Sequence, residues 1–261
     1  TYLGKLLDPI DVILGSVEML EEALVSSERV FGFLDLDEEV VDYKERVDDF
    51  IGEVAFEHIS FKYTPTGPYV LKDISFEAKP KQTVAFVGHT GSGKSTTMSL
   101  LMRFFDYEEG SIKIDGRELN TMSKQAFRRH VGMVLQDPIL FKGTIASNIS
   151  LNDPEVTDEM ILEALKSIGA EGLLEKYEKG IYAEVSNLGD NLSTGERQLL
   201  SFARAMLYDP SILILDEATA NIDTETEQMI SHALKVASRD RTTFIVAHRL
   251  STIKDADMII V

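Results

Sequence analysis

The sequence predicts an α/β fold built on a mainly parallel sheet, and three observations support this prediction. Continuous apolar runs, as strands buried on both faces require, occur at residues 83–87, 212–215 and 243–246. Alternating apolar and polar residues at 54–63 and 74–78 predict antiparallel strands ahead of most of the parallel ones. Between residues 148 and 209 the pattern is nearly all helical, which indicates a helical insert within the α/β core.

The composition is strongly acidic. The 261 residues include 44 Asp and Glu but only 26 Lys and Arg, which gives a formal net charge of −18. This charge argues against a nucleic-acid partner, because nucleic-acid binding relies on basic side chains, and it disfavours a polybasic contact with anionic lipid. The absence of cysteine excludes disulfides, thiolate metal sites and thiol catalysis. No apolar run reaches the roughly 20 residues that a membrane-spanning helix needs.

The first part of the chain predicts a helix followed by a linker. Apolar residues recur at spacings of three and four from Ile10 to Leu24, so we expect an amphipathic helix over 1–34. Pro9 either lies in the first turn of this helix or kinks a longer one. Residues 35–52 are rich in acidic side chains and indicate a solvated linker. A folded domain is expected over 53–261, and its ending in a strand-like apolar run suggests a C-terminally truncated piece of a longer protein.

One segment carries a pattern for binding phosphate groups. Residues 88–95 fit G-x-x-x-x-G-K-[ST] between a predicted buried strand and a helix predicted over 95–105. The glycines let backbone N–H groups turn toward phosphate oxygens, the helix N-terminus adds a favourable dipole, and Lys94 reaches the outer phosphates. Ser95 supplies a hydroxyl to Mg²⁺. The predicted ATP-binding residues here are Gly88, His89, Thr90, Gly91, Ser92, Gly93, Lys94, Ser95 and Thr96.

An acidic pair ends a second buried strand. The run 212–215 is followed by Asp216 and Glu217. Ligands bind at the carboxyl ends of strands in parallel sheets, so we expect Asp216 to hold the hydration shell of Mg²⁺. Glu217 is then placed to polarise an attacking water. A phosphate loop and an acidic strand end alone leave kinases, GTPases, helicases and transporters open.

A third segment narrows this choice. Residues 191–198 read Asn-Leu-Ser-Thr-Gly-Glu-Arg-Gln and stand directly before a predicted helix. With the other motifs, which occur in the family's order, they make residues 53–261 resemble the nucleotide-binding domain of the ATP-binding cassette (ABC) transporters. The resemblance implies a P-loop NTPase core with a mainly parallel sheet, an antiparallel β subdomain and an inserted helical subdomain at about 140–209. It also implies an ATPase that uses ATP and Mg²⁺.

The resemblance assigns roles to further residues. Tyr63 matches the aromatic residue that stacks on adenine, and Gln136 matches the glutamine that touches Mg²⁺ and the membrane domain. The remaining matches are the signature residues Ser193, Thr194, Gly195 and Glu196, the D-loop residue Asp223 and the switch histidine His248. The catalytic set is thus Lys94, Glu217 and His248, and the metal set is Ser95, Gln136 and Asp216. Taken alone, Tyr63 fits simple packing equally well, and a lone His248 is more typical of a structural role.

The resemblance also implies partners. In the family the signature faces the γ-phosphate held by the opposite subunit, which implies a head-to-tail dimer with a second nucleotide-binding domain. Residues 1–34 resemble the cytoplasmic end of the last membrane helix of exporters, which implies transmembrane domains and a place at the cytoplasmic face of a cell membrane. An ordinary packing helix is the alternative for 1–34. For the whole chain, a soluble cassette ATPase and an ATP switch without turnover are the alternatives. The sequence does not specify the exported substrate.

The signature departs from the usual L-S-G-G-Q. Thr194 places a β-branched side chain where backbone freedom is normal, and Glu196 places an acid close to the expected γ-phosphate. A carboxylate there repels phosphate unless it is turned away or paired. This pattern resembles one half of heterodimeric bacterial multidrug exporters, in which one ATP site is degenerate, so we expect a non-identical partner. A homodimer whose signature tolerates both substitutions is the alternative.

Overall fold

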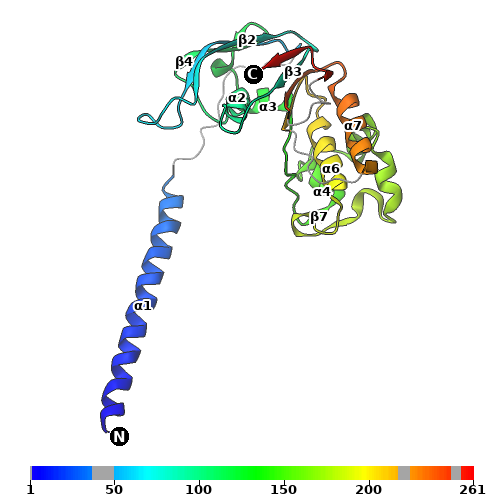
Figure 1. Cartoon of the computed structure of the whole chain (residues 1–261). Helices are drawn as coiled ribbons and strands as arrows, with labels where there is room; N and C mark the ends of the chain where they lie inside the picture. Colours follow the sequence, from blue (N-terminus) through cyan, green and yellow to red (C-terminus); the bar gives the residue numbers. More distant parts are fainter. Residues whose placement is uncertain (1, 37–49, 217–223, 248–253) are drawn as a thin grey trace. The chain divides into compact units, whose positions relative to one another are not determined.

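The computed structural model describes residues 2–36, 50–216, 224–247 and 254–261. The chain forms two units, Thr1–Val41 and Asp42–Val261. The first unit contains one long helix, α1 (Tyr2–Leu34), drawn in blue in Figure 1. Pro9 lies inside α1, and the apolar side chains from Ile10 onward are exposed. The helix expected over 1–34 is therefore present, and Pro9 stands within it rather than at its start.

A five-stranded parallel sheet forms the centre of the second unit. Its strand order is β11-β3-β10-β9-β6, with the bounds Met258–Ile260, Thr83–Phe86, Thr242–Val246, Ile212–Asp216 and Val131–Val134. Alternate residues of these strands enter two different hydrophobic clusters: Leu213 and Leu215 belong to one, and Ile212 and Ile214 belong to the other. Both faces of the sheet are thus covered, which explains why its strands read as unbroken apolar runs.

An antiparallel sheet packs on one face of the parallel sheet, through the cluster that contains Ile212 and Ile214. Its order is β2-β1-β4-β5, with the bounds Leu71–Ala78, Val54–Phe61, Glu109–Ile114 and Arg117–Glu118. The hairpin of β4 and β5 was not predicted. Its two-residue turn consists of Asp115 and Gly116, both with positive φ, as a hairpin between strands of right-handed twist requires. The same cluster holds α2 (Lys94–Leu101) and α3 (Lys124–Arg129), with the short η1 (Leu119–Thr121) between them.

Helices cover the other face of the parallel sheet. The helix α6 (Thr194–Met206) is central there, and α4 (Ile145–Ser150), α5 (Asp158–Ser167) and α7 (Thr224–Ser238) contact it. Figure 1 shows α4 and α6 close to β7, which pairs with β8 in a two-stranded ribbon, and α7 above them. The remaining elements are β7 (Gly143–Thr144), β8 (Glu184–Val185), η2 (Glu171–Lys176), η3 (Gly180–Tyr182) and η4 (Asn187–Gly189). The predicted helical insert is therefore present, although it includes a short ribbon and several 3₁₀ turns.

Two boundaries differ from the sequence-based expectations. The helix predicted over 95–105 ends at Leu101, because Arg103 adopts a left-handed φ of 54° while its buried guanidinium donates to the carbonyl of Met122. The folded unit already includes Phe50, whose ring lies 4.7 Å from the ring of His130. A linker ending at 52 is thus too long by at least three residues.

Candidate nucleotide-binding site

The carboxyl edge of the parallel sheet brings the predicted site residues together. Val246 of β10 pairs with Phe86 of β3 on one side and with Asp216 of β9 on the other. On β6, Val134 pairs with Leu215, the neighbour of Asp216. The segments that begin at Gly88 and contain Gln136 follow β3 and β6, so both leave the same edge at which Asp216 ends its strand. Ligands of such sheets bind at this edge.

The phosphate-binding loop follows β3 and leads into α2. Gly93 is the N-cap of α2, with φ of 91° and no side-chain cap, so the first amide N–H groups of the helix do not donate to a capping side chain. A Cβ at Gly93 would stand 2.6 Å from Cδ2 of Leu71, and a Cβ at Gly88 would stand 2.7 Å from Oγ of Ser92. Only glycine satisfies both the left-handed backbone and the space at Gly93.

The ammonium group of Lys94 lies inside this loop. Its Nζ donates to the carbonyl oxygens of Gly88 at 2.8 Å and His89 at 3.0 Å, and to Oγ of Ser92 at 3.4 Å. Gly88, His89, Thr90 and Gly91 are exposed, so the loop is open to solvent. A cation surrounded by a solvent-accessible loop at a helix N-terminus is the arrangement that receives a phosphate chain.

Tyr63 stands next to the loop. It lies two residues beyond the end of β1, and its ring is half exposed. The hydroxyl groups of Tyr63 and Thr96 are 2.9 Å apart, which joins the aromatic ring to the first turn of α2. The ring also contacts Phe61 and Phe105, with centroid distances of 5.1 and 5.0 Å and near-perpendicular planes. Tyr63 is thus a fixed and accessible aromatic surface beside the phosphate loop.

Three oxygen-bearing side chains fit a magnesium ion at the sheet edge. The donors are the hydroxyl of Ser95, the amide of Gln136 and the carboxylate of Asp216. Ser95 and Gln136 are exposed, and Asp216 is half-buried at the end of β9. Hard cations such as Mg²⁺ prefer oxygen ligands and take only a few from the protein when phosphates supply the rest. The donor set therefore fits the predicted ion.

The signature lies at the N-terminus of α6. Ser193 is the N-cap and forms a capping box with Glu196: Oγ of Ser193 accepts from the Glu196 amide at 3.2 Å, and the Ser193 amide donates to Oε2 of Glu196 at 2.8 Å. The other carboxylate oxygen, Oε1, is 3.3 Å from Nζ of Lys176. Ser193 and Thr194 are exposed, and Gly195 is buried.

The pairing determines the charge state of Glu196. Burial alone would raise the pKa of this carboxyl, but the hydrogen bonds from Ser193 and Lys176 and the charge of Lys176 outweigh burial and hold the pKa below its ordinary value. Glu196 is therefore an ionised carboxylate whose two oxygens both have partners.

Sequence comparisons with known proteins identify the family. A family profile described as "ABC transporter" matches residues 71–220. The chain is 53% identical over its whole length to the probable multidrug resistance ABC transporter ATP-binding/permease protein YheH of Bacillus subtilis, and covers 38% of that protein. It is 44% identical to a fatty acid ABC transporter ATP-binding/permease protein of Mycobacterium bovis, of which it covers 41%. The chain belongs to the ABC transporter family.

The chain is the ATP-binding domain of an ABC transporter, and domains of this family hydrolyse ATP for transport. The predictions of fold and family are confirmed. The chain spans about two fifths of the length of these relatives. Within the described ranges, none of the helices combines the length and the apolar character that crossing a bilayer requires. Three predicted residues of the ABC site, Glu217, Asp223 and His248, lie outside the described residues.

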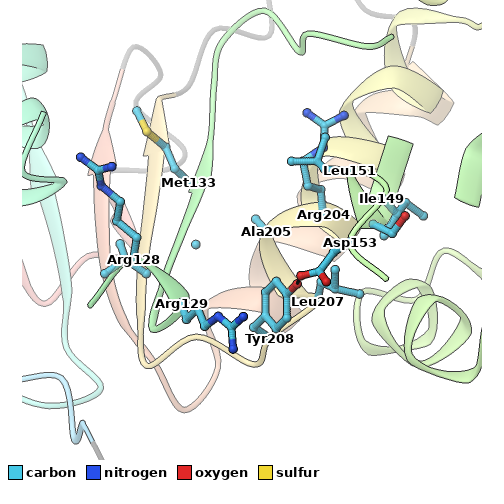
Figure 2. A pocket seen from close by; sticks show the side chains of 13 residues that line it. Arg128, Arg129, Met133, Ile149, Leu151, Asp153, Arg204, Ala205, Leu207 and Tyr208 are labelled. Atoms are coloured by element: carbon cyan, nitrogen blue, oxygen red, sulfur yellow. Dashed lines mark hydrogen bonds between the residues drawn. The ribbon is translucent and has the colours of Figure 1, made fainter. Parts of the chain in front are cut away.

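Apart from the nucleotide site, a cavity of about 300 Å³ lies between the edge strand β6 and the helices α4 and α6. Figure 2 shows Arg128 and Met133 on one side of it and Arg204, Tyr208 and Leu151 on the other. On the side of Arg204, the hydroxyl of Tyr208 donates to the carboxylate of Asp153.

Arg204 fixes the segment that follows Gln136. Its Nη1 donates to the carbonyl of Ile139 at 3.0 Å, and its Nε donates to the carbonyl of Asn148 at 2.8 Å. Asn148 is buried and bonds both the amide and the carbonyl of Phe141, each at 2.8 Å. These bonds place three exposed apolar side chains, Ile139, Phe141 and Leu151, on the segments that Arg204 and Asn148 hold together.

Sequence reasoning missed several of these residues. Phe105, Lys176 and Arg204 contact segments that are distant in the chain, whereas Asn148 bonds Phe141 seven residues before it; none of the four belongs to a short motif. An apolar pair at 104–105, at the end of the predicted loop helix, was the one available signal for Phe105. Lys176 carried no signal, because a lone lysine in a helical stretch normally indicates a solvated face.

Proposed function

We propose that this chain binds MgATP and hydrolyses it to drive export across a membrane, as the nucleotide-binding half of an exporter. The observation that carries the proposal is the common sheet edge at which the Lys94 loop, Gln136 and Asp216 meet. The names of the relatives, which include multidrug and fatty acid ABC transporters, support an export function. The chain would lie at the cytoplasmic face of the membrane, held there by its permease.

In this proposal the nucleotide lies between Tyr63 and the phosphate loop. Tyr63 stacks on adenine, while the loop amides and Lys94 hold the phosphate chain. Lys94 exchanges the carbonyls of Gly88 and His89 for phosphate oxygens, because a charge-assisted bond to an anion is stronger than a bond to a neutral carbonyl. Thr96, in the first turn of α2, holds the Tyr63 hydroxyl during this contact.

The metal and the attacking water complete the proposed site. Ser95, Gln136 and Asp216 would hold Mg²⁺, which neutralises charge on the phosphate oxygens. Glu217 follows Asp216 directly and is proposed to orient and polarise the water for in-line attack on the γ-phosphorus. His248, two residues beyond β10, is proposed to donate to the γ-phosphate. Such catalysis is mainly positioning and electrostatic stabilisation.

A second nucleotide-binding domain is proposed to close the site head-to-tail, with Asp223 at the contact. We propose a non-identical partner, as the altered signature suggests. Thr194 supports this proposal, because a β-branched residue replaces the glycine usual at that position. The chain would then supply Lys94, Glu217 and His248 to the active site, and its own signature to the weaker site on its partner.

One observation favours the homodimer as a second candidate. The Glu196 carboxylate is bound by Ser193 and Lys176 and contributes no unpaired negative charge. The repulsion that argued against a working signature is therefore largely compensated. A homodimer with two equal sites is compatible with this arrangement.

We further propose that the exposed side chains of Ile139, Phe141 and Leu151, the last of which lines the cavity of Figure 2, receive the membrane part of the transporter. All three side chains are more than half exposed. The chain covers only about two fifths of relatives named as ATP-binding/permease proteins, so a permease is the partner of suitable chemistry. In the assembled transporter, Leu151→Glu is expected to lower substrate-stimulated ATP hydrolysis while leaving ATP binding by the chain unchanged. Unchanged stimulation would refute this docking surface.

The test of the proposed function is the Glu217→Gln variant. It removes the carboxylate that polarises water but keeps a side chain of the same shape, so ATP binding is expected to persist while phosphate release stops. ATP binding is measured on the purified chain by titration calorimetry, and phosphate release is measured on the assembled transporter, in which the partner domain closes the site. Rapid phosphate release by the variant would refute the role of Glu217.

Light scattering on the same variant addresses the partner. A doubling of mass with MgATP, absent with MgADP, supports the homodimer, because only a bound γ-phosphate links the two signatures. A chain that binds ATP and remains monomeric supports the heterodimer. Failure of the wild-type chain to bind ATP at all would refute the proposed function.

A further inference from the structure

The ring of Tyr63 is held by a set of contacts that no motif describes. Phe61 and Phe105 meet it at centroid distances of 5.1 and 5.0 Å, with interplanar angles of 82° and 83°, and Phe61 and Phe105 also touch each other at 6.0 Å. Aromatic rings attract in this edge-to-face geometry. Together with the hydroxyl bond to Thr96, these contacts fix both the position and the tilt of the Tyr63 ring.

Phe105 reaches Tyr63 because α2 ends early. The helix stops at Leu101, and the left-handed Arg103, whose guanidinium is anchored on Met122, turns the chain. The two neighbouring phenylalanines then separate: Phe104 lies 5.4 Å from the guanidinium of Arg128, and Phe105 lies against Tyr63. The turn at Arg103 therefore places one specific ring beside the proposed adenine contact.

The rings remain accessible after this packing. Tyr63 is 50% exposed and Phe105 is 42% exposed, whereas Phe61 is buried beneath them. A cavity of about 250 Å³ opens beside the three rings. An exposed aromatic pair held at a fixed angle costs less conformational entropy on binding a flat ligand than a freely rotating tyrosine does.

We propose that Phe105 is a positioning residue for nucleotide recognition: it holds Tyr63 in the orientation that stacks on the base. The inference rests on the proposed role of Tyr63 and extends it to a residue outside every motif. Phe105 contributes to the affinity for the nucleoside part of the ligand and leaves the affinity for the phosphate part unchanged. The chain thereby distinguishes a nucleotide from an inorganic phosphate chain of equal length.

The experiment compares MgADP with magnesium pyrophosphate, which carries the same two phosphates without the nucleoside. Neither ligand supports turnover, so calorimetric titration of the full chain measures binding alone. We expect Phe105→Ala to weaken ADP binding by about two- to tenfold, in line with an aromatic pair. Pyrophosphate binding is expected to stay at the wild-type value.

Two further variants separate positioning from general damage. Phe105→Tyr keeps the ring and is expected to bind ADP as the wild type does. Phe104→Ala removes the adjacent ring, which is also exposed, and is expected to change neither affinity.

Unchanged ADP affinity in Phe105→Ala would overturn the inference, and so would equal weakening of ADP and pyrophosphate, which indicates a damaged loop. In both cases the wild type still binds ADP, and the proposed function stands. Failure of the wild type to bind either ligand would overturn the proposed function as well.

Discussion

The pairing of Glu196 makes a quantitative prediction about the signature. Its two carboxylate oxygens have separate partners, the Ser193 amide and the Lys176 ammonium. Two substitutions of Glu196 therefore separate the two interactions. Glu196→Gln keeps an oxygen for the Ser193 amide, since glutamine also closes a capping box, but loses the ion pair. Glu196→Ala loses both.

The structure sets the size of each loss. The Glu196 side chain is 13% exposed but that of Lys176 is 59% exposed, so the ion pair is screened on one side and is worth about 0.2–1 kcal/mol. The capping bond adds about 1 kcal/mol. We therefore expect Glu196→Gln to lower the free energy of unfolding by less than about 1 kcal/mol, and Glu196→Ala by about 1.2–2 kcal/mol.

Urea unfolding at pH 7, followed by circular dichroism, measures both losses. Lys176→Met should match Glu196→Gln, and the double variant should lose no more than either single one, because both remove the same ion pair. Equal stability of Glu196→Gln and Glu196→Ala would refute the capping bond. Additive losses in the double variant would refute the ion pair.

The lowered pKa of Glu196 adds a pH dependence with a definite sign. A carboxyl with a lower pKa in the folded state contributes its full stability above the unfolded pKa, and this contribution is lost as pH falls through the folded pKa. The ordinary pKa is 4.5. The gap between wild type and Glu196→Gln should thus be complete at neutral pH and should close progressively as pH falls below 4.5.

Three further predictions concern single residues. Gly93→Ala should abolish ADP binding and destabilise the chain more than Gly91→Ala, because both have positive φ but only Gly93 would press a Cβ against Leu71; calorimetry and thermal unfolding test this. Asn148→Ala should cost about 1–3 kcal/mol in urea unfolding, because buried groups lose their partners. Burial and a bond to a carboxylate raise the pKa of Tyr208 to about 12, so stability should fall as pH rises from 10 toward 12, and less so in Tyr208→Phe.

The local part of the site could be predicted from the sequence. The phosphate loop is contiguous, and its chemistry follows from glycine, lysine and serine at fixed spacing before a helix. The buried strands were also visible, because covering both faces of a sheet demands unbroken apolar runs such as 212–215. From parallel strands it followed that Asp216 and Lys94 share one edge.

Contacts between distant segments could not be predicted in this way. The early end of α2 depends on the buried guanidinium of Arg103 reaching Met122, which only the folded chain brings near. Lys176 reaches Glu196 because the turns between α5 and α6 fold back to the start of α6. The missed hairpin is different: Asp115-Gly116 is a strong two-residue turn signal and was present in the sequence.

The signature shows why a departure from a motif cannot be interpreted from the altered letter alone. An unpaired acid at position 196 would repel a phosphate held by a partner, and this repulsion was half of the reason for expecting a non-identical subunit. In the fold, the carboxylate closes the capping box and meets Lys176, so the pair of side chains carries no net charge. The heterodimer proposal then depends on Thr194, whose Oγ1 accepts from Arg197 of its own helix at 3.2 Å. The two dimers therefore differ in whether the backbone at 193–195 can approach a phosphate held by the partner despite the β-branched side chain of Thr194. The ATP-dependent mass of Glu217→Gln tests this.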